Sequence, residues 1–425
     1  MKKALKLSFM LAIVGGLVLL KACSTSDPTP LTIVSITADG VDLNGATSAT
    51  GVKAGSTIVV TFATNLDSKT AVASNVTLKR DYDQANADLT LTVNGATLTI
   101  KPNNSLTNGA LYILQLSSAL ASDKGKTLTA AERNFTTEGV FAPDGAVAKW
   151  TFEDTAEDVV GTFDPTANQV VDISYSSSHN AAAGKAASFN GSTSIIEVSN
   201  GDQLVNNGDW TLSFWVKALS IQKTSGHFVM GLGAFYGFQF EITGDYSWVK
   251  LAGSYKLSQA YVDAHPGSTG YTTEDLWFPG DGKDKDHGGW QGWDYVKDLS
   301  GNGGVASLIK DTWAHVVITY DATAKKGTMY INGTKVKSQD FNLWPDGDAK
   351  QSVTGLGYSG KEPDVKNELA FGFIQSRAGT MWAQEPWGGY TIPTSNHFKG
   401  LLDDIIVYKK KITEAEILLM YNSGK

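Results

Sequence analysis

The segment "PGDGKDKDHGGWQGWDY", residues 279–295, places charged and aromatic side chains between glycines. A buried strand could not hold so many unpaired charges, and a solvated loop gains little by exposing indole rings. Exposed Trp and Tyr rings match the apolar C–H face of a sugar, whereas Asp and His match its rim of hydroxyl groups. The segment and the tryptophan just before it therefore predict a sugar-stacking platform made of Trp277, Trp290, Trp293, Tyr295, Asp281 and His287.

A second loop, residues 376–398, has the same character and reads "SRAGTMWAQEPWGGYTIPTSNHF". Each ring that covers one face of a sugar removes on the order of 50 to 80 Å² of apolar area from water, worth about 1 to 2 kcal/mol. Two or three rings would give roughly millimolar to micromolar affinity. The alternative is that the rings of both loops form small cores that pin the loops to the fold. The candidate binding residues here are Arg377, Trp382, Gln384, Trp387 and Tyr390.

The run "DGKDKDHGG" also suggests a calcium site, because hard cations take several oxygen ligands from a loop bent by glycine. Asp284 and Asp286 would be ligands, and their spacing partly follows the start of an EF-hand loop. A glutamate that would close such a loop at its twelfth position is missing. Bound Ca²⁺ and a solvated charged loop both remain open.

Catalytic motifs are not evident. Retaining glucanases of the jelly-roll type place two carboxylates about 5 to 5.5 Å apart, commonly on an E-x-D-x-E strand. The nearest acidic cluster, "FEDTAED" at residues 152–158, has the wrong spacing. The sequence contains neither G-x-S-x-G nor H-E-x-x-H. We therefore predict that the chain is not an enzyme, with a glycoside hydrolase kept as an alternative.

Composition restricts the class of protein. The 425 residues carry a formal net charge of -8, and nothing in the sequence resembles the basic stripe that tracks a phosphate backbone. Nucleic acid is excluded as an expected partner. The 44 glycines, with abundant Ser and Thr, favour strands and turns over helices. The fold class that we predict is all-β.

The first 22 residues are typical of a bacterial export signal. Lys2, Lys3 and Lys6 precede an apolar run over residues 9–20, which is long enough for a signal and short for a membrane-spanning helix. The run ends in "LLKAC", which resembles a lipobox although Lys21 is unusual there. The resemblance implies an acylated Cys23 that anchors the mature protein in a lipid bilayer. An ordinary signal peptide cut elsewhere is the alternative. Residues 23–30 would form a short tether.

Residues 31–139 show short alternating strands separated by Gly or Asn turns. "STIVVTFATNLD" places Ile58, Val60 and Phe62 on one face, and "ADLTLTVNGATLTIKP" has a turn at Asn94 and Gly95 between two strands. With "TLTIKPNNSLTNGALYILQLSSALASDKGKTL" and "NFTTEG", the region resembles the bacterial Ig-like domains. The resemblance implies a spacer domain.

Residues 141–425 contain all eleven tryptophans. The strand patterns "GDWTLSFWVKA", "DTWAHVVITYDATAKKGTMYINGTKV" and "HFKGLLDDIIVYKKKITEAEILLMYNSGK" closely resemble the laminin-G-like, concanavalin A-like jelly-roll family. In the last pattern Thr413 and Glu416 have capping-box spacing, which predicts a short C-terminal helix after the final strand. The resemblance implies a two-sheet sandwich that in many relatives binds carbohydrate, sometimes with calcium.

The join between Lys217 and Trp313 is longer than the family pattern. We expect an aromatic-rich insertion over about residues 251–305 that lacks regular strands and serves binding. Together the patterns predict a lipoprotein of the outer membrane, at the cell surface, whose jelly-roll domain binds glycan. Neighbouring glycan-uptake proteins would be further partners. A protein-binding adhesin that uses the same aromatic surface is the first alternative.

Overall fold

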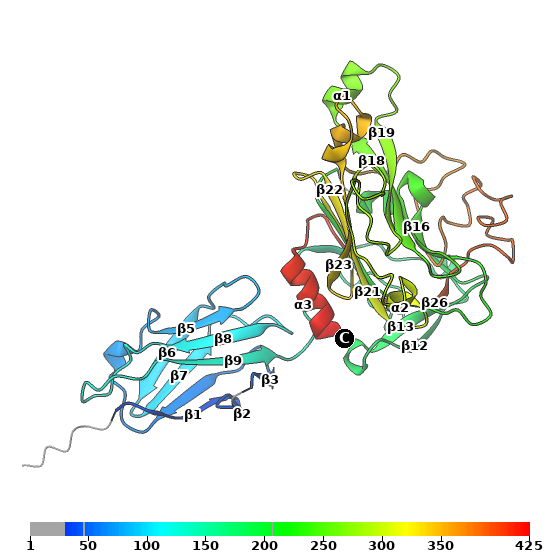
Figure 1. Cartoon of the computed structure of the whole chain (residues 1–425). Helices are drawn as coiled ribbons and strands as arrows, with labels where there is room; N and C mark the ends of the chain where they lie inside the picture. Colours follow the sequence, from blue (N-terminus) through cyan, green and yellow to red (C-terminus); the bar gives the residue numbers. More distant parts are fainter. Residues whose placement is uncertain (1–29, 46, 206) are drawn as a thin grey trace, which may run out of the picture.

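The computed structural model describes residues 30–45, 47–205 and 207–425. The predicted export signal, the acylation site Cys23 and most of the predicted tether lie outside these residues. Two β-sandwiches follow one another along the chain, and the C-terminal helix lies on the side of the second that faces the first (Figure 1). The predicted all-β class, with its Ig-like and jelly-roll parts and short final helix, is confirmed. Over the described residues, no helix has the length and apolarity needed to span a bilayer.

The first sandwich pairs a sheet of order β2-β1-β4-β7-β6 with one of order β3-β9-β8-β5. Alternation fills its core, because Ile58, Val60 and Phe62 are buried while their neighbours are not. Asn94 pairs with Thr97 across the predicted turn, and Gly95 there has a positive φ of 57°. The strands are β1 (Ile33–Ala38), β2 (Val41–Asp42), β3 (Ala49–Val52), β4 (Ile58–Phe62), β5 (Val76–Arg80), β6 (Leu89–Asn94), β7 (Thr97–Pro102), β8 (Leu111–Leu116) and β9 (Ala131–Thr137).

One sheet of the second sandwich has the order β12-β13-β26-β15-β21-β22-β23-β20, with β10 paired to β26. Its inner face carries Leu212, Phe214 and Val216, which belong to the large core between the sheets. The strands are β10 (Ala146–Trp150), β12 (Ser174–Ser177), β13 (Lys185–Asn190), β15 (Trp210–Ala218), β20 (Trp293–Val296), β21 (Ala314–Asp321), β22 (Lys326–Ile331), β23 (Thr334–Asp340) and β26 (Lys399–Tyr408).

The opposing sheet has the order β11-β14-β25-β16-β17-β18-β19, with β24 paired to β18. Its strands are β11 (Val170–Val171), β14 (Ile195–Val198), β16 (His227–Leu232), β17 (Phe238–Ile242), β18 (Val249–Leu257), β19 (Tyr271–Phe278), β24 (Val353–Leu356) and β25 (Leu369–Phe371). Helical elements are η1 (Ser68–Thr70), η2 (Ala167–Gln169), η3 (Ala181–Ala183), η4 (Gly201–Leu204), η5 (Ala234–Tyr236), α1 (Gln259–Ala264), α2 (Ala306–Ile309), η6 (Phe341–Leu343), η7 (Ala349–Ser352) and α3 (Glu414–Gly424).

Helix α3 begins as the sequence predicts. Thr413 caps it and Glu416 completes the capping box. Its residues Ile417 and Met420 pack on Tyr408 and Ile406, on the outer face of the first of these two sheets. The helix therefore covers a sheet face that would otherwise expose apolar side chains.

The same helix contacts the first sandwich. Leu419 packs against both the first core and the cluster under α3, and Ser423 Oγ accepts a hydrogen bond of 2.9 Å from the backbone N–H of Phe141. The ring of Tyr82, from the first sandwich, meets the Phe141 ring edge-on at a centroid distance of 5.2 Å. A polar cleft of about 1090 Å³ lies beside these contacts.

The expectation of an irregular insertion over about residues 251–305 is wrong for half of its length. Strand β18 pairs with β19 over eight residue pairs, so this hairpin widens the second sheet. Strand β20 adds to the edge of the other sheet through β23. The charged segment around residues 279–292 remains a loop between β19 and β20. Apolar Leu276 and Phe278, which enter the core, are what hold the added hairpin in place.

Candidate functional site

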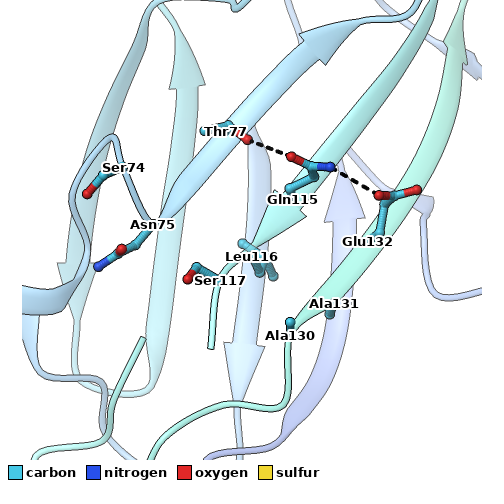
Figure 2. A pocket seen from close by; sticks show the side chains of 9 residues that line it. All are labelled: Ser74, Asn75, Thr77, Gln115, Leu116, Ser117, Ala130, Ala131 and Glu132. Atoms are coloured by element: carbon cyan, nitrogen blue, oxygen red, sulfur yellow. Dashed lines mark hydrogen bonds between the residues drawn. The ribbon is translucent and has the colours of Figure 1, made fainter. Parts of the chain in front are cut away.

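A depression of about 370 Å³ lies on the first sandwich, over β5, β8 and β9 (Figure 2). Gln115 links its two neighbours there: Thr77 Oγ1 donates to Gln115 Oε1 at 3.3 Å, and Gln115 Nε2 donates to Glu132 Oε2 at 3.2 Å. The lining residues include no aromatic ring. These polar groups satisfy one another across the strands, so the depression offers little to a ligand.

A group of exposed rings lies instead on the second sandwich. We call this group the aromatic patch. It comes from η5 and from the loop of residues 376–398, and its members are four aromatic residues and one methionine: Phe235, Tyr236, Met381, Trp382 and Trp387. The ring centroids are 4.8 Å apart for Phe235 and Tyr236, 5.8 Å for Phe235 and Trp382, and 6.2 Å for Trp382 and Trp387. Phe235, Met381 and Trp387 are 37%, 40% and 42% exposed. The patch is therefore continuous and open to water.

Close packing of backbone on backbone brings the two halves of the patch together. A Cβ on Gly231 would lie 2.1 Å from the carbonyl oxygen of Ile374, so only glycine lets β16 approach the segment that leads into the loop. Gly233 has a φ of +56° and turns the chain into η5. Both positions need glycine for a physical reason, and both lie immediately before the exposed rings.

Ionic and hydrogen-bonded contacts fix the loop on the sheet. The guanidinium of Arg377 donates to the Glu197 carboxylate at 3.0 and 2.6 Å and to the carbonyl oxygen of Asn168 at 2.7 Å. Hydrogen bonding to Glu197 raises the pKa of Arg377 above its usual value. The Tyr390 hydroxyl donates to the carbonyl oxygen of Thr193. Arg377 and Tyr390 thus position the loop. Their geometry favours this role over the predicted one of contacting the ligand.

An apolar cluster underlies the patch. Phe228, Ala370, Phe373 and Ile374 are buried between the loop and the outer face of the sheet, and Trp382 and Tyr390 pack against them. His397 stacks on Phe373 at a centroid distance of 4.4 Å. Part of each ring is therefore structural, and the small-core alternative is correct for Tyr390. Trp387 contacts this cluster only at the edge of Phe228.

Sequence reasoning found Trp382 and Trp387 but missed Phe235, Tyr236 and Met381. The signal was the run "GAFYG", in which two rings stand between glycines. In the structure η5 interrupts the strands at this run. Gln384, the remaining candidate from this loop, is exposed next to the patch.

The sugar-stacking platform that the sequence predicts for Trp277 and residues 279–295 does not form. Trp293 is only 4% exposed, and its ring lies in the core with the ammonium nitrogen of Lys337 3.2 Å from its centroid. It pairs with Gln339 across the strands, whereas Tyr295 pairs with Ser338. The register shifts between these two pairs, so Trp293 and Tyr295 lie opposite adjacent residues of β23, whose side chains point to opposite faces, and the two rings do not share a surface.

The other rings of that segment are separate from one another. Trp290 is 68% exposed, and no ring contact involves it within the described part of the chain. Trp277 is half-buried, edge-on to Trp293 at 5.6 Å and to Trp248 at 6.2 Å. Tyr295 lies under the ammonium group of Lys335 at 4.9 Å. These positions do not bring three rings onto one ligand face.

The charged residues of the segment mostly organise its own turns. Asp281 accepts from the backbone N–H of Lys283 at 3.2 Å. Asp284 accepts from the N–H groups of Asp286 and His287 and lies 2.6 Å from His287 Nδ1. Hydrogen bonding to His287 lowers the pKa of Asp284. Over the described residues no three His, Cys, Asp or Glu side chains converge as metal ligands. The arrangement of Asp284 and Asp286 is therefore that of a turn.

A buried acid–base cluster lies elsewhere, between β26 and the turn before β13. Asp403 contacts Ser178 and lies 3.5 Å from His179 Nδ1, and burial raises its pKa to about 6. The side chains of His179 and Asp403 are 2% and 1% exposed. His179 stacks on Trp215 at 3.9 Å. No substrate could reach these groups in this structure, so the cluster is structural.

Family models match two separate parts of the chain. Residues 27–137 match the bacterial Ig-like domain, and residues 246–369 match the concanavalin A-like lectin/glucanases superfamily. The second match contains β18 to β24, which belong to both sheets of the second sandwich. The chain therefore carries a bacterial Ig-like domain followed by a concanavalin A-like domain. No curated protein matches the chain.

Solved structures resemble it only distantly. The botulinum neurotoxin type G receptor binding domain is 14% identical over 65% of this chain and 51% of its own, with a TM-score of 0.37. The binding domain of Paraclostridial Mosquitocidal Protein 1 is 15% identical over 66% of this chain and 52% of its own, with a TM-score of 0.41. The chain spans about half the length of these structures. Likeness at this level says nothing of what the chain binds.

Proposed function

We propose that the chain is an exported, lipid-anchored protein that binds glycan through the aromatic patch of its concanavalin A-like domain. The observation that carries the proposal is the row of rings Phe235, Trp382 and Trp387, in which Phe235 and Trp387 are exposed and the partly buried Trp382 lies between them. Rings held in advance lose little conformational freedom on binding, which leaves more of the contact energy as affinity.

The chemistry of the patch suits a sugar. Each ring offers an apolar face, and hydrogen-bonding groups such as Gln384 and Glu385 are exposed in the same loop. Covering two rings would contribute about 2 to 4 kcal/mol before association costs, which corresponds to weak binding by one site. Many copies on a cell surface would bind a polysaccharide far more tightly than one copy, because the second contact becomes intramolecular.

The membrane anchor belongs to the proposal as well. The basic and apolar residues before Cys23 support export, and the Ig-like domain would stand between the bilayer and the patch. Globomycin, which blocks cleavage of lipoprotein signals, should cause the unprocessed form to accumulate if Cys23 is acylated. Processing that persists unchanged with Cys23→Ala would support an ordinary signal peptide instead.

Affinity electrophoresis of the chain from Ser24 to Lys425 against a polysaccharide panel tests the binding proposal. Retardation by at least one polysaccharide, reduced in Trp387→Ala, is the expected result. Lys409→Gln, at the far end of β26, is the matched control. Release of reducing ends would place the protein among the hydrolases, and no retardation by any member of the panel would contradict glycan binding.

A further inference from the structure

Two lysines lie close together near the end of the loop of residues 376–398. Lys223 belongs to the loop of residues 219–226 between β15 and β16, and Lys399 begins β26. In the part of the chain that the structure describes, neither lysine forms an ion pair.

The same loop holds both ammonium groups. Lys223 Nζ donates to Ser225 Oγ at 2.7 Å and makes a long contact of 3.5 Å with the carbonyl oxygen of Ser395. Lys399 Nζ donates to the carbonyl oxygen of Ile221 at 2.7 Å. An ammonium group has three N–H donors, so three of the six remain unused. The two groups therefore have spare hydrogen-bond capacity as well as charge.

The surroundings of Lys223 change its pKa. Burial, and then the charge of Lys399, lowers the pKa of Lys223 to about 8, so the group is still mostly charged at pH 7. The hydroxyl of Ser395, on a residue that is fully buried, has no hydrogen-bond partner. Because this hydroxyl is closed off from solvent, a ligand at the surface does not contact it.

The acidic and titratable neighbours do not neutralise the pair. Asp311, which the loop does bind, accepts from Ser220 N and Ser220 Oγ at 2.7 and 2.5 Å. It is not among the groups that shift the pKa of Lys223. His227 and His397 stay neutral, because burial lowers their pKa values to about 3 and about 4.

This lysine pair adjoins the aromatic patch through one short segment. Asn396, which follows Ser395, donates its N–H to the carbonyl oxygen of Trp387 at 3.0 Å and accepts from the N–H of Phe228 at 2.7 Å. The Trp387 ring rests on Phe228. The loop backbone therefore links the lysine pair to Trp387, since Lys223 Nζ lies 3.5 Å from the carbonyl oxygen of Ser395.

We propose that Lys223 and Lys399 form a subsite for an anionic group, the carboxylate or sulfate of an acidic glycan whose neighbouring ring stacks on Trp387. The inference rests on the proposed function and narrows its ligand class. An ammonium pair binds a carboxylate or sulfate through charge-assisted hydrogen bonds, which are shorter and stronger than neutral ones.

Matched pairs of glycans test the subsite. The full chain from Ser24 is measured against dextran and dextran sulfate, and against mucin O-glycans before and after removal of sialic acid and sulfate. The expected result is at least tenfold tighter binding of the acidic member in one pair, with an affinity that falls as salt is raised from 50 to 300 mM. Lys223→Gln with Lys399→Gln should abolish this preference and keep any neutral binding. Lys409→Gln should change neither.

The outcomes distinguish the anionic subsite from the more general proposal that the aromatic patch binds glycan. Equal binding of acidic and neutral members would overturn the subsite and leave glycan binding intact. Binding of no glycan would remove both. Inorganic sulfate is tested alone by thermal shift at constant ionic strength; stabilisation lost in the double variant, without any glycan preference, would assign the lysine pair to a free anion and overturn the glycan subsite. If the double variant does not fold, Lys399→Gln alone is used with the same readouts.

Discussion

Two loops of similar composition reach opposite results in this protein. Residues 279–295 and residues 376–398 both contain two tryptophans, a tyrosine and several polar groups among glycines. In the first, Trp293 enters the core and Trp290 is isolated at the surface. In the second, Trp382 and Trp387 join rings from η5 to make a continuous exposed patch. Composition alone therefore does not decide whether a loop tryptophan binds ligand or stabilises the fold.

The element that carries each loop explains the difference. Trp293 lies on β20, a strand added to a sheet edge, and the register shift in this strand leaves its ring on the inward face while Tyr295 stays exposed. The loop of residues 376–398 lies flat on the outer face of the opposing sheet and buries one layer of side chains, Phe373 and Ile374 among them. Among the rings above that layer, Trp387 is left exposed to water. A loop that covers a sheet can present a surface, whereas a strand at its edge is drawn into the core.

The largest expected effect is on stability. Trp293→Ala should lower the free energy of unfolding by about 3 to 5 kcal/mol, because a buried ring is removed and its cavity cannot fully close. Chemical denaturation of the chain from Ser24 measures this, with Trp290→Ala as the matched control from the same segment. A loss under about 1 kcal/mol would mean that Trp293 is not the core residue that distinguishes this loop.

The next effect is on ligand binding by the other loop. Trp387→Ala should weaken glycan affinity roughly five- to thirtyfold, since one stacking face worth about 1 to 2 kcal/mol is lost. Its melting temperature should move little because the ring is largely exposed. Affinity electrophoresis and a thermal scan of the same sample decide between the roles. A collapse of the melting temperature with unchanged affinity would show that Trp387 stabilises the fold and does not bind glycan.

The third effect concerns Lys337, whose buried ammonium group lies beside the Trp293 ring in the core. Lys337 is fully buried without a hydrogen-bond partner, and burial lowers its pKa to about 6. Between pH 6 and the usual lysine value the unfolded chain binds more protons, so this residue makes stability rise with pH over that range. Lys337→Met should raise the free energy of unfolding at pH 7 by about 1 to 3 kcal/mol and remove that part of the slope. Denaturation at pH 6, 7.5 and 9 measures both, and a destabilised Met variant would contradict the account.

The smallest effect concerns the exposed ring of the first loop. Trp290→Ala should change the free energy of unfolding by less than about 0.5 kcal/mol, because surface positions without partners rarely contribute more. It should also leave glycan affinity unchanged, as the ring is not part of the aromatic patch. A tenfold loss of affinity on titration with the best polysaccharide would show that the first loop also binds.

Local signals in the sequence were reliable. The capping box of Thr413 and Glu416 and the turn at Asn94 and Gly95 formed as predicted, because each depends on residues close together in the sequence. The β18–β19 hairpin was missed, since its charged outer residues, such as Lys250 and Asp275, pair with each other and hide the alternation. The lysine pair was also missed, because Lys223 and Lys399 are far apart in sequence.

The sequence by itself determined the two-domain β architecture, the strand faces of the core and the helix that closes it, because periodicity and turn chemistry act over a few residues. Only the tertiary structure decided which tryptophans face water, that Arg377 holds Glu197 and positions its loop, and that Lys223 and Lys399 come together. Such facts depend on which strands become neighbours. Contact between residues distant in the chain is set by packing of the whole sandwich and leaves no local pattern.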